Sequence, residues 1–338
     1  MRRIATPAYA MALAVTCVAF VALALASSAA ALPSSHGQLL RLAPFRPTAN
    51  ATQSSNWLGY DQGTIEQGGG KLFNSITGQW TVPSAAPHAS GQAASSSDWI
   101  GIGGGCVDAG CAVTDQTLIQ TGTEQDVSAT GAATYSAWWE AIPAPSVSIA
   151  SVNVSPGDRM YASVAEAIPG SNVWTITLRD LTNGQSSTTT VPYASTHATA
   201  EWIEENPLVL GTSGSGFSTL PSLTSPAFDL ATTNGAPVKL TASEGMQLID
   251  SNGNVIGAPS APDPESDGFN ACAWASVCPT PGLATGPATT TSSGRTAARH
   301  ATRHRTRKRH TTARVRHKRR STKHRPRRTR RTRRTRRR

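Results

Sequence analysis

Three glutamates surround one tryptophan in the stretch ATAEWIEENP, residues 198–207, which places Glu201, Glu204 and Glu205 close together in the sequence. A carboxylate held against an aromatic wall can act as a general acid or base, because burial and nearby charges adjust its affinity for a proton. The alternative is that these side chains are simply solvated. The residues that would work with such a carboxylate decide between the two.

The common hydrolytic motifs are missing from the chain. There is no His-Glu-x-x-His zinc motif, no Gly-x-Ser-x-Gly nucleophile turn and no pair of Asp-Thr-Gly or Asp-Ser-Gly loops. The stretch GIGGGC, residues 101–106, is followed by neither a lysine nor a helical pattern, so it predicts a loop and no phosphate cradle. Ahead of the C-terminal tail, histidine occurs only as His36, His88 and His197. His197, four residues before Glu201, is either its partner or a structural residue.

Polar side chains also occur among aromatic ones in two segments with strand-like alternation. In TLIQTGTEQDV, a strand would place Gln120, Gly122 and Glu124 on one face, and in YSAWWEAIP it would place Trp138 and Glu140 together. If these faces line a groove, they offer an amide, carboxylates and indole walls to an extended ligand. Alternation alone fits equally well with the wet side of a half-exposed sheet.

The elements that must position these residues are strands. The segments NSITGQWTVP, MYASVAEA and NVWTITLRDL are alternating or rich in β-branched and aromatic residues, and turn signals separate them. In the last segment Trp174, Ile176 and Leu178 share one face, and Asn183-Gly184 predicts a hairpin turn before QSSTTTV. Long amphipathic helical patterns are absent. The body, about 230 residues long, is therefore expected to be one all-β domain, a sandwich or a barrel.

Cysteine usage predicts an oxidising compartment. Cys17 lies in the N-terminal apolar segment, and an even number remains in the body. The close spacings favour pairing Cys106 with Cys111 and Cys272 with Cys278, among three connectivities that four cysteines permit. A metal site is the alternative, but nearby histidines are lacking and the spacing is not the short paired kind that zinc uses. No metal is expected.

The N-terminal segment has the pattern of a secretory signal. Arg2 and Arg3 precede a long apolar run that ends in small residues, and this predicts a signal peptide over residues 1–31. A retained membrane anchor is the alternative, although no basic stop-transfer flank follows the run. Residues 32–52 are interpreted as a linker or a short propeptide. The protein is therefore expected to be secreted, with retention at the cell surface as a further prediction from the tail.

The C-terminal tail differs sharply in composition from the body. Of the 31 Lys and Arg residues, 23 lie between Arg295 and Arg338, and this stretch contains no acidic or aromatic residue. We expect residues 281–338 to form a disordered linker and basic tail, because they cannot bury enough apolar surface to offset the entropy of ordering. Such a tail favours attachment to an anionic cell-wall polymer or membrane surface. A solvated extension is the alternative, and the lack of aromatic residues disfavours specific nucleic-acid binding.

Eight short stretches together carry a specific resemblance. SNWLGY, ITGQWTVPSA, SSSDWIGIGG, LIQTG, YSAWWEAIP, SPGDRMYASV, LTNGQ and AEWIEE occur in the order and approximate spacing of the eqolisin family of glutamic peptidases. The resemblance spans Asn56 to the neighbourhood of Asp250. It implies a single β-sandwich of two antiparallel sheets, a concanavalin-like jelly roll, over residues 53–280.

The resemblance also implies which residues act. The glutamine of the family's Gln-Thr-Gly motif corresponds to Gln120, and the glutamate of its Ala-Glu-aromatic-Ile motif corresponds to Glu201. These two would be the catalytic pair. The residues implied to bind substrate are Trp57, Trp99, Trp138, Glu140 and Glu124.

Three positions depart from the family pattern. Gly103 stands where many members have Asp in Trp-x-Gly-Ile-Asp-Gly, Glu124 stands where the acid after Gln-Thr-Gly is usually Asp, and Ile142 replaces a tyrosine. The pair is intact, whereas the hydrogen bonds that support it and the substrate preference are affected by these changes.

The expected function is therefore that of an acid-acting endopeptidase without a cofactor, a monomer whose substrates are proteins or peptides. A carboxylate of ordinary pKa remains partly ionised in acid, where a histidine base would be fully protonated. Two alternatives belong to other classes. One is a β-sandwich glycosidase that uses Glu140 and Glu201 as its two carboxyl groups. The other is a non-catalytic module that binds glycan or cell wall through the same indoles.

Overall fold

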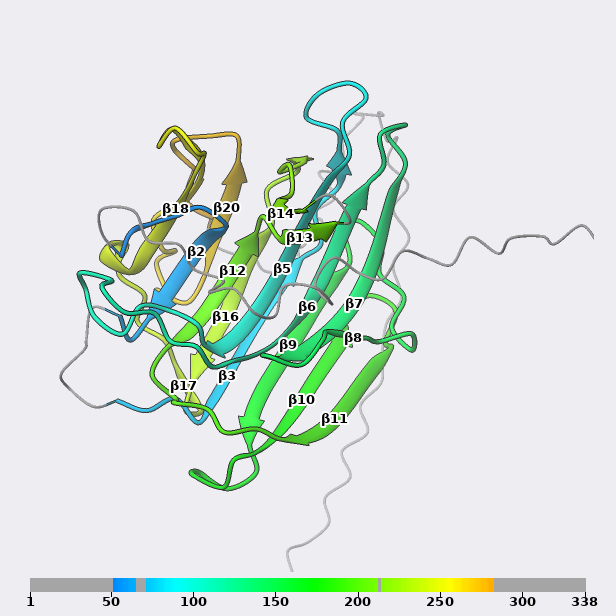
Figure 1. Ribbon diagram of the computed structural model, residues 1–338. Coiled ribbons are helices and arrows are strands. Elements are labelled where there is room, and N and C mark those ends of the chain that lie inside the picture. The colour runs from blue at the N-terminus through cyan, green and yellow to red at the C-terminus, as the bar shows by residue number, and fades with distance from the viewer. Residues whose placement is uncertain (1–50, 65–70, 212–213, 283–338) are drawn as a thin grey trace, which may run out of the picture. The chain divides into compact units, whose positions relative to one another are not determined.

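The computed structural model describes residues 51–64, 71–211 and 214–282, and it is built almost entirely of β-strands (Figure 1). The chain divides into two units, residues 1–286 and 287–338, and every described residue belongs to the first. The predicted signal peptide, nearly all of the predicted linker or propeptide, and the basic tail lie outside the described residues. In the described part, no helix has the length and apolar character needed to cross a membrane.

One continuous path of paired strands accounts for most of the domain. Its order is β11 (Ser186–Pro192), β10 (Val173–Asp180), β9 (Arg159–Glu166), β3 (Ser75–Thr81), β16 (Ala227–Thr233), β20 (Phe269–Ala273), β19 (Val255–Pro259), β18 (Gly245–Ile249), β2 (Trp57–Gln62), β12 (Ala200–Glu205), β5 (Ala94–Gly103), β6 (Leu118–Val127), β7 (Ala133–Ala141) and β8 (Val147–Ser148). Neighbours on this path pair antiparallel. The first five strands of this path form one layer, and its last six strands form a second layer, in the order β2, β12, β5, β6, β7 and β8. Strands β20, β19 and β18 join the two layers (Figure 1).

Short elements complete the domain. They are β1 (Gln53–Ser54), which pairs parallel with β18, β4 (Ala85–Ala86) with β15 (Ser222–Leu223), β13 (Leu208–Gly211) with β14 (Gly214–Phe217), β17 (Ala236–Pro237) with β16, and a 3-10 turn, η2 (Ala242–Glu244). The predicted all-β sandwich is confirmed. The predicted hairpin is also confirmed, because β10 and β11 pair directly across the turn in which Gly184 has a φ of +80°.

The main hydrophobic core lies between the two layers and explains the alternation in the sequence. Trp174, Ile176 and Leu178 on β10 are all buried in it, as the sequence predicts. Tryptophans tie the layers together, since Trp80 on β3 donates from Nε1 to the Thr123 hydroxyl on β6 at 2.9 Å. Trp202 on β12 donates from Nε1 to the Thr77 carbonyl at 2.9 Å in return. These contacts fix the second layer against the first.

Two carboxyl groups are buried on this core side of the second layer. Asp98 on β5 pairs in register with Glu204 on β12, and both side chains are fully buried. Gln125 donates from Nε2 to Asp98 Oδ2 at 3.2 Å. Burial, partly opposed by hydrogen bonds from Glu204 and Gln125, raises the pKa of Asp98 to about 7. Burial and then the charge of Asp98 raise the pKa of Glu204 well above its usual range.

These raised pKa values predict a fold that is most stable in acid. The folded chain keeps protons that the unfolded chain releases above a pH of about 4. Each such proton makes the unfolding free energy fall by about 1.4 kcal/mol per pH unit until the folded pKa is passed. We expect Asp98→Asn to flatten the decline in stability between about pH 4 and the raised Asp98 pKa of about 7. Urea unfolding at a series of pH values measures this slope.

The control is Gln92→Asn, which changes an exposed side chain. It should leave the slope unchanged, because it neither adds nor removes an ionisable group. Equal slopes for the wild type and Asp98→Asn would contradict the prediction.

Candidate active site

The two residues predicted to act together lie in one row across the second layer. Glu201 on β12 is directly opposite Gly101 on β5, and Gly101 is directly opposite Gln120 on β6. The row continues outward to Asp61 on β2, which pairs with Glu201, and to Glu140 on β7, which pairs with Gln120. Because paired residues in a sheet point to the same face, all four side chains project from the side of the layer opposite the main core, here called the site face.

Gly101 leaves the space between the two side chains open. A Cβ at this position would lie 2.9 Å from Leu118 Cδ1, 3.0 Å from Trp99 Cζ3 and 3.1 Å from Gln120 Cβ. Gln120 and Glu201 are two strand spacings apart, or about 10 Å at the backbone. Their side chains can therefore approach one small molecule from opposite sides only because nothing projects from the strand between them.

Filling this space is expected to impair both the fold and the site. Gly101→Ala should lower the unfolding free energy by about 1–3 kcal/mol through overpacking. By displacing Gln120, it should also lower kcat by roughly 10- to 100-fold, as small misplacements of reacting groups do. Gly216→Ala is the matched control, since a Cβ there meets no atom within 4 Å. Wild-type kcat in folded Gly101→Ala would show that the open space is not needed.

Glu140 fixes the orientation of the Gln120 amide. Gln120 Nε2 donates to Glu140 Oε2 at 2.7 Å, and an ionised carboxylate only accepts hydrogen bonds, so the nitrogen must face Glu140. Gln120 is only 3% exposed, and its Oε1 has no hydrogen-bond partner among the described residues. The amide thus retains one acceptor and its second N–H for a ligand. The sequence places Glu140 near substrate, and the structure adds this contact with Gln120.

Glu201 is a buried carboxyl group in acidic surroundings. Burial raises the pKa of Glu201 well above its usual range, and the like charges of Asp61 and Asp115 raise it further. The Thr199 hydroxyl and the Gly105 amide oppose this shift. Within the described part of the chain, neither carboxylate oxygen of Glu201 has a partner with full hydrogen-bond geometry. The group is a base that holds its proton more tightly than an exposed glutamate does.

Aromatic side chains surround the row on the same face. Trp57, Trp99 and Trp138 are all fully buried and belong to a second apolar cluster, and the Trp57 and Trp99 rings meet edge to face at 5.0 Å. Trp99 donates from Nε1 to Glu205 Oε2 at 2.8 Å. Glu124 is also buried on this face, four residues along β6 from Gln120. The sequence left a groove and a wet surface as alternatives, and burial of these groups excludes the wet surface.

His197 does not serve Glu201. Its Nε2 lies 3.2 Å from Glu166 Oε2, and its ring packs against Trp174 with centroids 5.2 Å apart. Burial tends to raise the pKa of Glu166, but backbone hydrogen bonds from Gly170 and Asn172 and the contact with His197 outweigh it and lower the pKa. The structural interpretation of His197 therefore holds.

Two acidic residues beside Glu201 were missed from the sequence. Asp61 follows Trp57 by four residues in WLGYDQ, so strand alternation alone could have placed it on the face that Trp57 occupies. Asp115 precedes β6 in a loop, where its carboxylate accepts hydrogen bonds from the backbone and hydroxyl of Thr117, both at 2.9 Å. Residues in loops follow no regular alternation, so nothing in the sequence indicated that Asp115 lies near Glu201.

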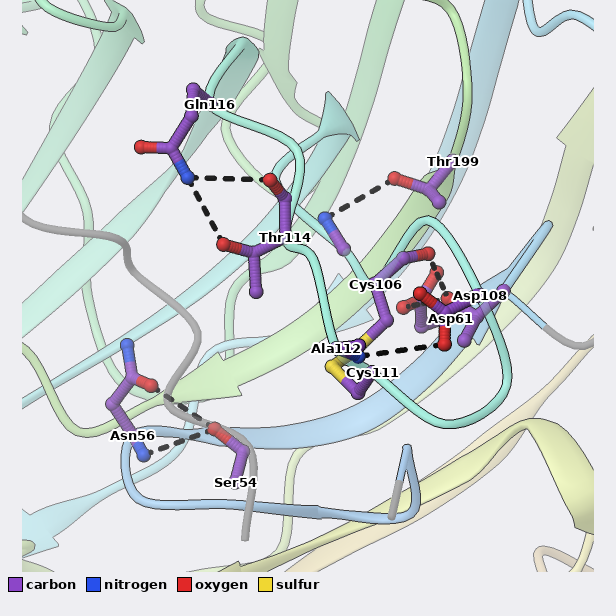
Figure 2. Close-up of a disulfide and its surroundings, with 12 residues drawn as sticks. Ser54, Asn56, Asp61, Cys106, Asp108, Cys111, Ala112, Thr114, Gln116 and Thr199 are labelled. Atoms are coloured by element: carbon purple, nitrogen blue, oxygen red, sulfur yellow. Dashed lines mark hydrogen bonds between the residues drawn. A yellow bond between two sulfur atoms is a disulfide. The ribbon is translucent and has the colours of Figure 1, made fainter.

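The disulfide pairs favoured by spacing are confirmed. Cys106 joins Cys111 and Cys272 joins Cys278. Figure 2 shows the first of these closing a loop whose chain runs past Asp61 and Thr199. The disulfide thus restrains the wall next to Glu201.

Away from the site face, one group of carboxylates is close enough to suit a metal ion. Asp229, Asp263 and Asp267 bring ligand atoms within 4.8 Å of one another. Exposed acidic groups often gather in this way without a metal. Asp229 lies on β16 and the other two lie between β19 and β20, so none of them belongs to the row of Gln120 and Glu201.

Comparisons with known proteins identify the family and the fold. Residues 55–267 match the peptidase A4 family. The structure is similar to scytalido-glutamic peptidase bound to a transition state analog inhibitor, with 22% identity and a TM-score of 0.51 over 65% of this chain and 98% of that chain. A complex of the same peptidase with a peptide-based transition state analog gives 24% identity and a TM-score of 0.50 over the same shares.

A further solved structure, SCP-B of the eqolisin family in complex with the tripeptide Ala-Ile-His, gives 23% identity and a TM-score of 0.48 over 65% of this chain and 98% of that chain. No curated protein matches the chain. Because the family match spans more than half of the sequence, the protein belongs to the peptidase A4 family, the eqolisins, and is a peptide-bond hydrolase.

Proposed function

We propose that the protein is an exported, acid-acting endopeptidase in which Gln120 and Glu201 together activate one water molecule. The observation that carries this proposal is the row Glu201–Gly101–Gln120, which places an amide and a carboxyl group on the same face of the layer, separated only by a glycine that has no side chain. The tryptophans of the same face would provide the apolar walls for a polypeptide substrate.

In the proposed reaction, ionised Glu201 removes a proton from a water whose hydrogen bond is accepted by Gln120 Oε1. The water oxygen attacks the scissile carbonyl carbon, and the remaining N–H of Gln120 donates to the oxyanion that forms. Glu201 then returns the proton to the amide nitrogen as the carbon–nitrogen bond breaks. Glu140 supports the step because its bond to Nε2 holds the amide in this orientation. No covalent intermediate with the protein is needed.

The pH range follows from the surroundings of Glu201. Its raised pKa means that the base is ionised only at a pH above the range of exposed carboxyl groups. Activity should therefore fall toward strong acid as Glu201 takes up a proton. We expect the optimum to lie in mild acid, and maximal proteolysis at neutral pH with little in acid would exclude the acid-acting proposal.

The geometry does not favour a glycosidase. The two carboxyl groups of a glycosidase flank the bond that is cleaved. In this row Gln120 and Gly101 lie between Glu140 and Glu201, and Glu140 Oε2 accepts the 2.7 Å hydrogen bond from Gln120. Assays for peptide products and for reducing sugar, run on the same preparation with and without pepstatin, test the proposed function. Release of sugar without peptide cleavage would overturn it.

The export signal and the tail add a proposal on location. The 23 Lys and Arg residues of the tail would hold the secreted enzyme at an anionic wall or membrane surface. Binding of the full chain to anionic vesicles, measured by co-sedimentation, should weaken in molar salt, because salt screens exposed charges beyond a few ångströms. Binding that persists in molar salt would contradict an electrostatic attachment.

A further inference from the structure

Asp61 is the residue on the neighbouring strand β2 that pairs directly with Glu201. The two residues are directly opposite each other on β2 and β12, so their side chains project side by side from the site face. Asp61 is 3% exposed and Glu201 is fully buried. Two carboxyl groups in such a position cannot both be ionised without a large cost.

The surrounding loop leaves space for the Asp61 carboxylate. A Cβ at position 105 would lie 2.5 Å from Asp61 Oδ2 and 2.9 Å from Oδ1, so a side chain there would displace the Asp61 carboxylate. The same Cβ would lie 2.9 Å from Thr199 Oγ1, and the Gly105 amide donates to that hydroxyl at 3.2 Å. Figure 2 shows Asp61 and Thr199 on either side of the segment that begins at Cys106. Gly105 therefore lies next to the Asp61 carboxylate and directly before the loop that the Cys106–Cys111 disulfide closes.

A hydroxyl group holds the charge on Asp61. The Thr64 hydroxyl, in a residue only 2% exposed, donates to Asp61 Oδ2 at 2.6 Å and lies 3.0 Å from the Cys106 carbonyl. A donor to a carboxylate favours its ionised form. Among the described residues, Glu201 has only the contacts with the Thr199 hydroxyl and the Gly105 amide, neither of which reaches full hydrogen-bond geometry, so the proton of this pair should reside on Glu201.

The other groups around Glu201 do not provide a positive charge. Its charged neighbours in the described chain are Asp61 on β2 and Asp115 in the loop before β6. Across β5 it faces Gly101 and then the neutral amide of Gln120, with Glu140 beyond. Position 103, where the family motif carries Asp, cannot supply a carboxylate here. Its φ is +93°, and a Cβ would lie 2.1 Å from the Thr117 carbonyl oxygen.

We propose that Asp61 is a positioning residue for the reaction, whose carboxylate on the adjacent strand makes ionised Glu201 a stronger base toward the attacking water; this inference rests on the proposed function. A base that holds its proton more tightly removes a proton from water more readily. Asp61 thus increases the basicity of Glu201 and confines its action to a less acid range. It does not touch the reacting atoms.

The proposal is tested with Asp61→Asn, which keeps the side-chain shape and can still accept the Thr64 hydroxyl bond. The acid limb of the kcat/KM profile should move to lower pH. Two pH units below the wild-type midpoint, the variant should keep a share of its plateau rate roughly three- to tenfold larger than the wild type keeps. Carbon NMR of labelled Glu carboxyl groups, assigned with Glu201→Gln, should show Glu201 titrating at lower pH in the variant. This second readout does not depend on activity.

Asp98→Asn is the matched control, because it makes the same change at a buried position on the opposite face of the layer. Its acid limb should coincide with that of the wild type. If Asp61→Asn fails to fold, Thr64→Val removes the donor to Asp61 and should move the limb in the same direction by a smaller amount. Profiles and NMR titrations that superpose on the wild type would overturn the proposal. A shifted Glu201 titration in a chain whose Glu201→Gln variant still cleaves peptides would instead refute the proposed function.

Discussion

Glu201→Gln is expected to lower kcat for peptide cleavage by roughly 10²- to 10⁴-fold, the usual contribution of a positioned general base. Glutamine has nearly the same shape and fits the same buried place in the row opposite Gly101. It cannot take a proton from water, so the first proton transfer loses its acceptor. Steady-state cleavage of a quenched fluorescent peptide in mild acid measures the loss. KM should change little, because the substrate walls remain intact.

The same variant should be more stable than the wild type at neutral pH. The raised pKa of Glu201 means that the folded state loses stability as pH rises through the range between the unfolded and folded values. A neutral glutamine avoids that loss, so the unfolding free energy should rise at neutral pH and converge with the wild type in strong acid. A variant that loses activity because it unfolds would lose stability as well. A loss of activity combined with a gain in stability therefore points to a direct role of the Glu201 carboxyl group in the reaction.

Glu204→Gln provides the matched control for Glu201→Gln. Glu204 lies on the same strand, is equally buried and also has a raised pKa, but its side chain points into the core between the layers beside Asp98. It should show the gain in stability without the loss of kcat. Equal losses of activity in both variants would mean that the effect comes from the strand as a whole. Wild-type activity in Glu201→Gln would refute the proposed mechanism.

Strand alternation predicted which side chains share a face within each strand. It placed Gln120 with Glu124 and Trp138 with Glu140, and the paired register of β6 and β7 brings these residues onto one face as expected. The order of Gln120 and Glu201 across the sheet could not be derived in this way. Pairing between strands some 80 residues apart depends on the packed core and not on any local pattern. Only the resemblance to the eqolisins brought these two residues together.

Burial was the second feature that alternation could not predict. The pattern of β12 reads as three carboxyl groups around Trp202, yet Glu201 and Glu205 project to the site face while Glu204 projects to the core side with that indole. The alternation of side chains along a strand assigns them to two faces, but it does not predict that both faces are buried. Whether a face is dry depends on loops such as that of the Cys106–Cys111 disulfide, whose course has no period in the sequence.

Gln120→Ala is expected to lower kcat by about 10²- to 10³-fold, the cost of losing one preorganised donor to an oxyanion. The change removes the acceptor Oε1 and the N–H together, so the attacking water and the oxyanion both lose their partner. It also removes the 2.7 Å hydrogen bond to Glu140, and a loss of about 1–3 kcal/mol in unfolding free energy should accompany the kinetic effect. Measuring kcat at temperatures well below the unfolding midpoint separates the two effects.

Gln125→Ala, on the same strand, makes the comparison specific. Gln125 is buried on the opposite face, where its Nε2 donates to the Ser96 hydroxyl at 2.8 Å and to Asp98 at 3.2 Å. Its replacement should lower stability by a similar amount and leave kcat unchanged. The same kcat for both alanine variants would show that Gln120 contributes only to folding. A loss of kcat confined to Gln120→Ala would show that the Gln120 amide takes part in catalysis. Since an amide does not act as the acid or base of the reaction, its contribution would be to position the water and to stabilise the oxyanion.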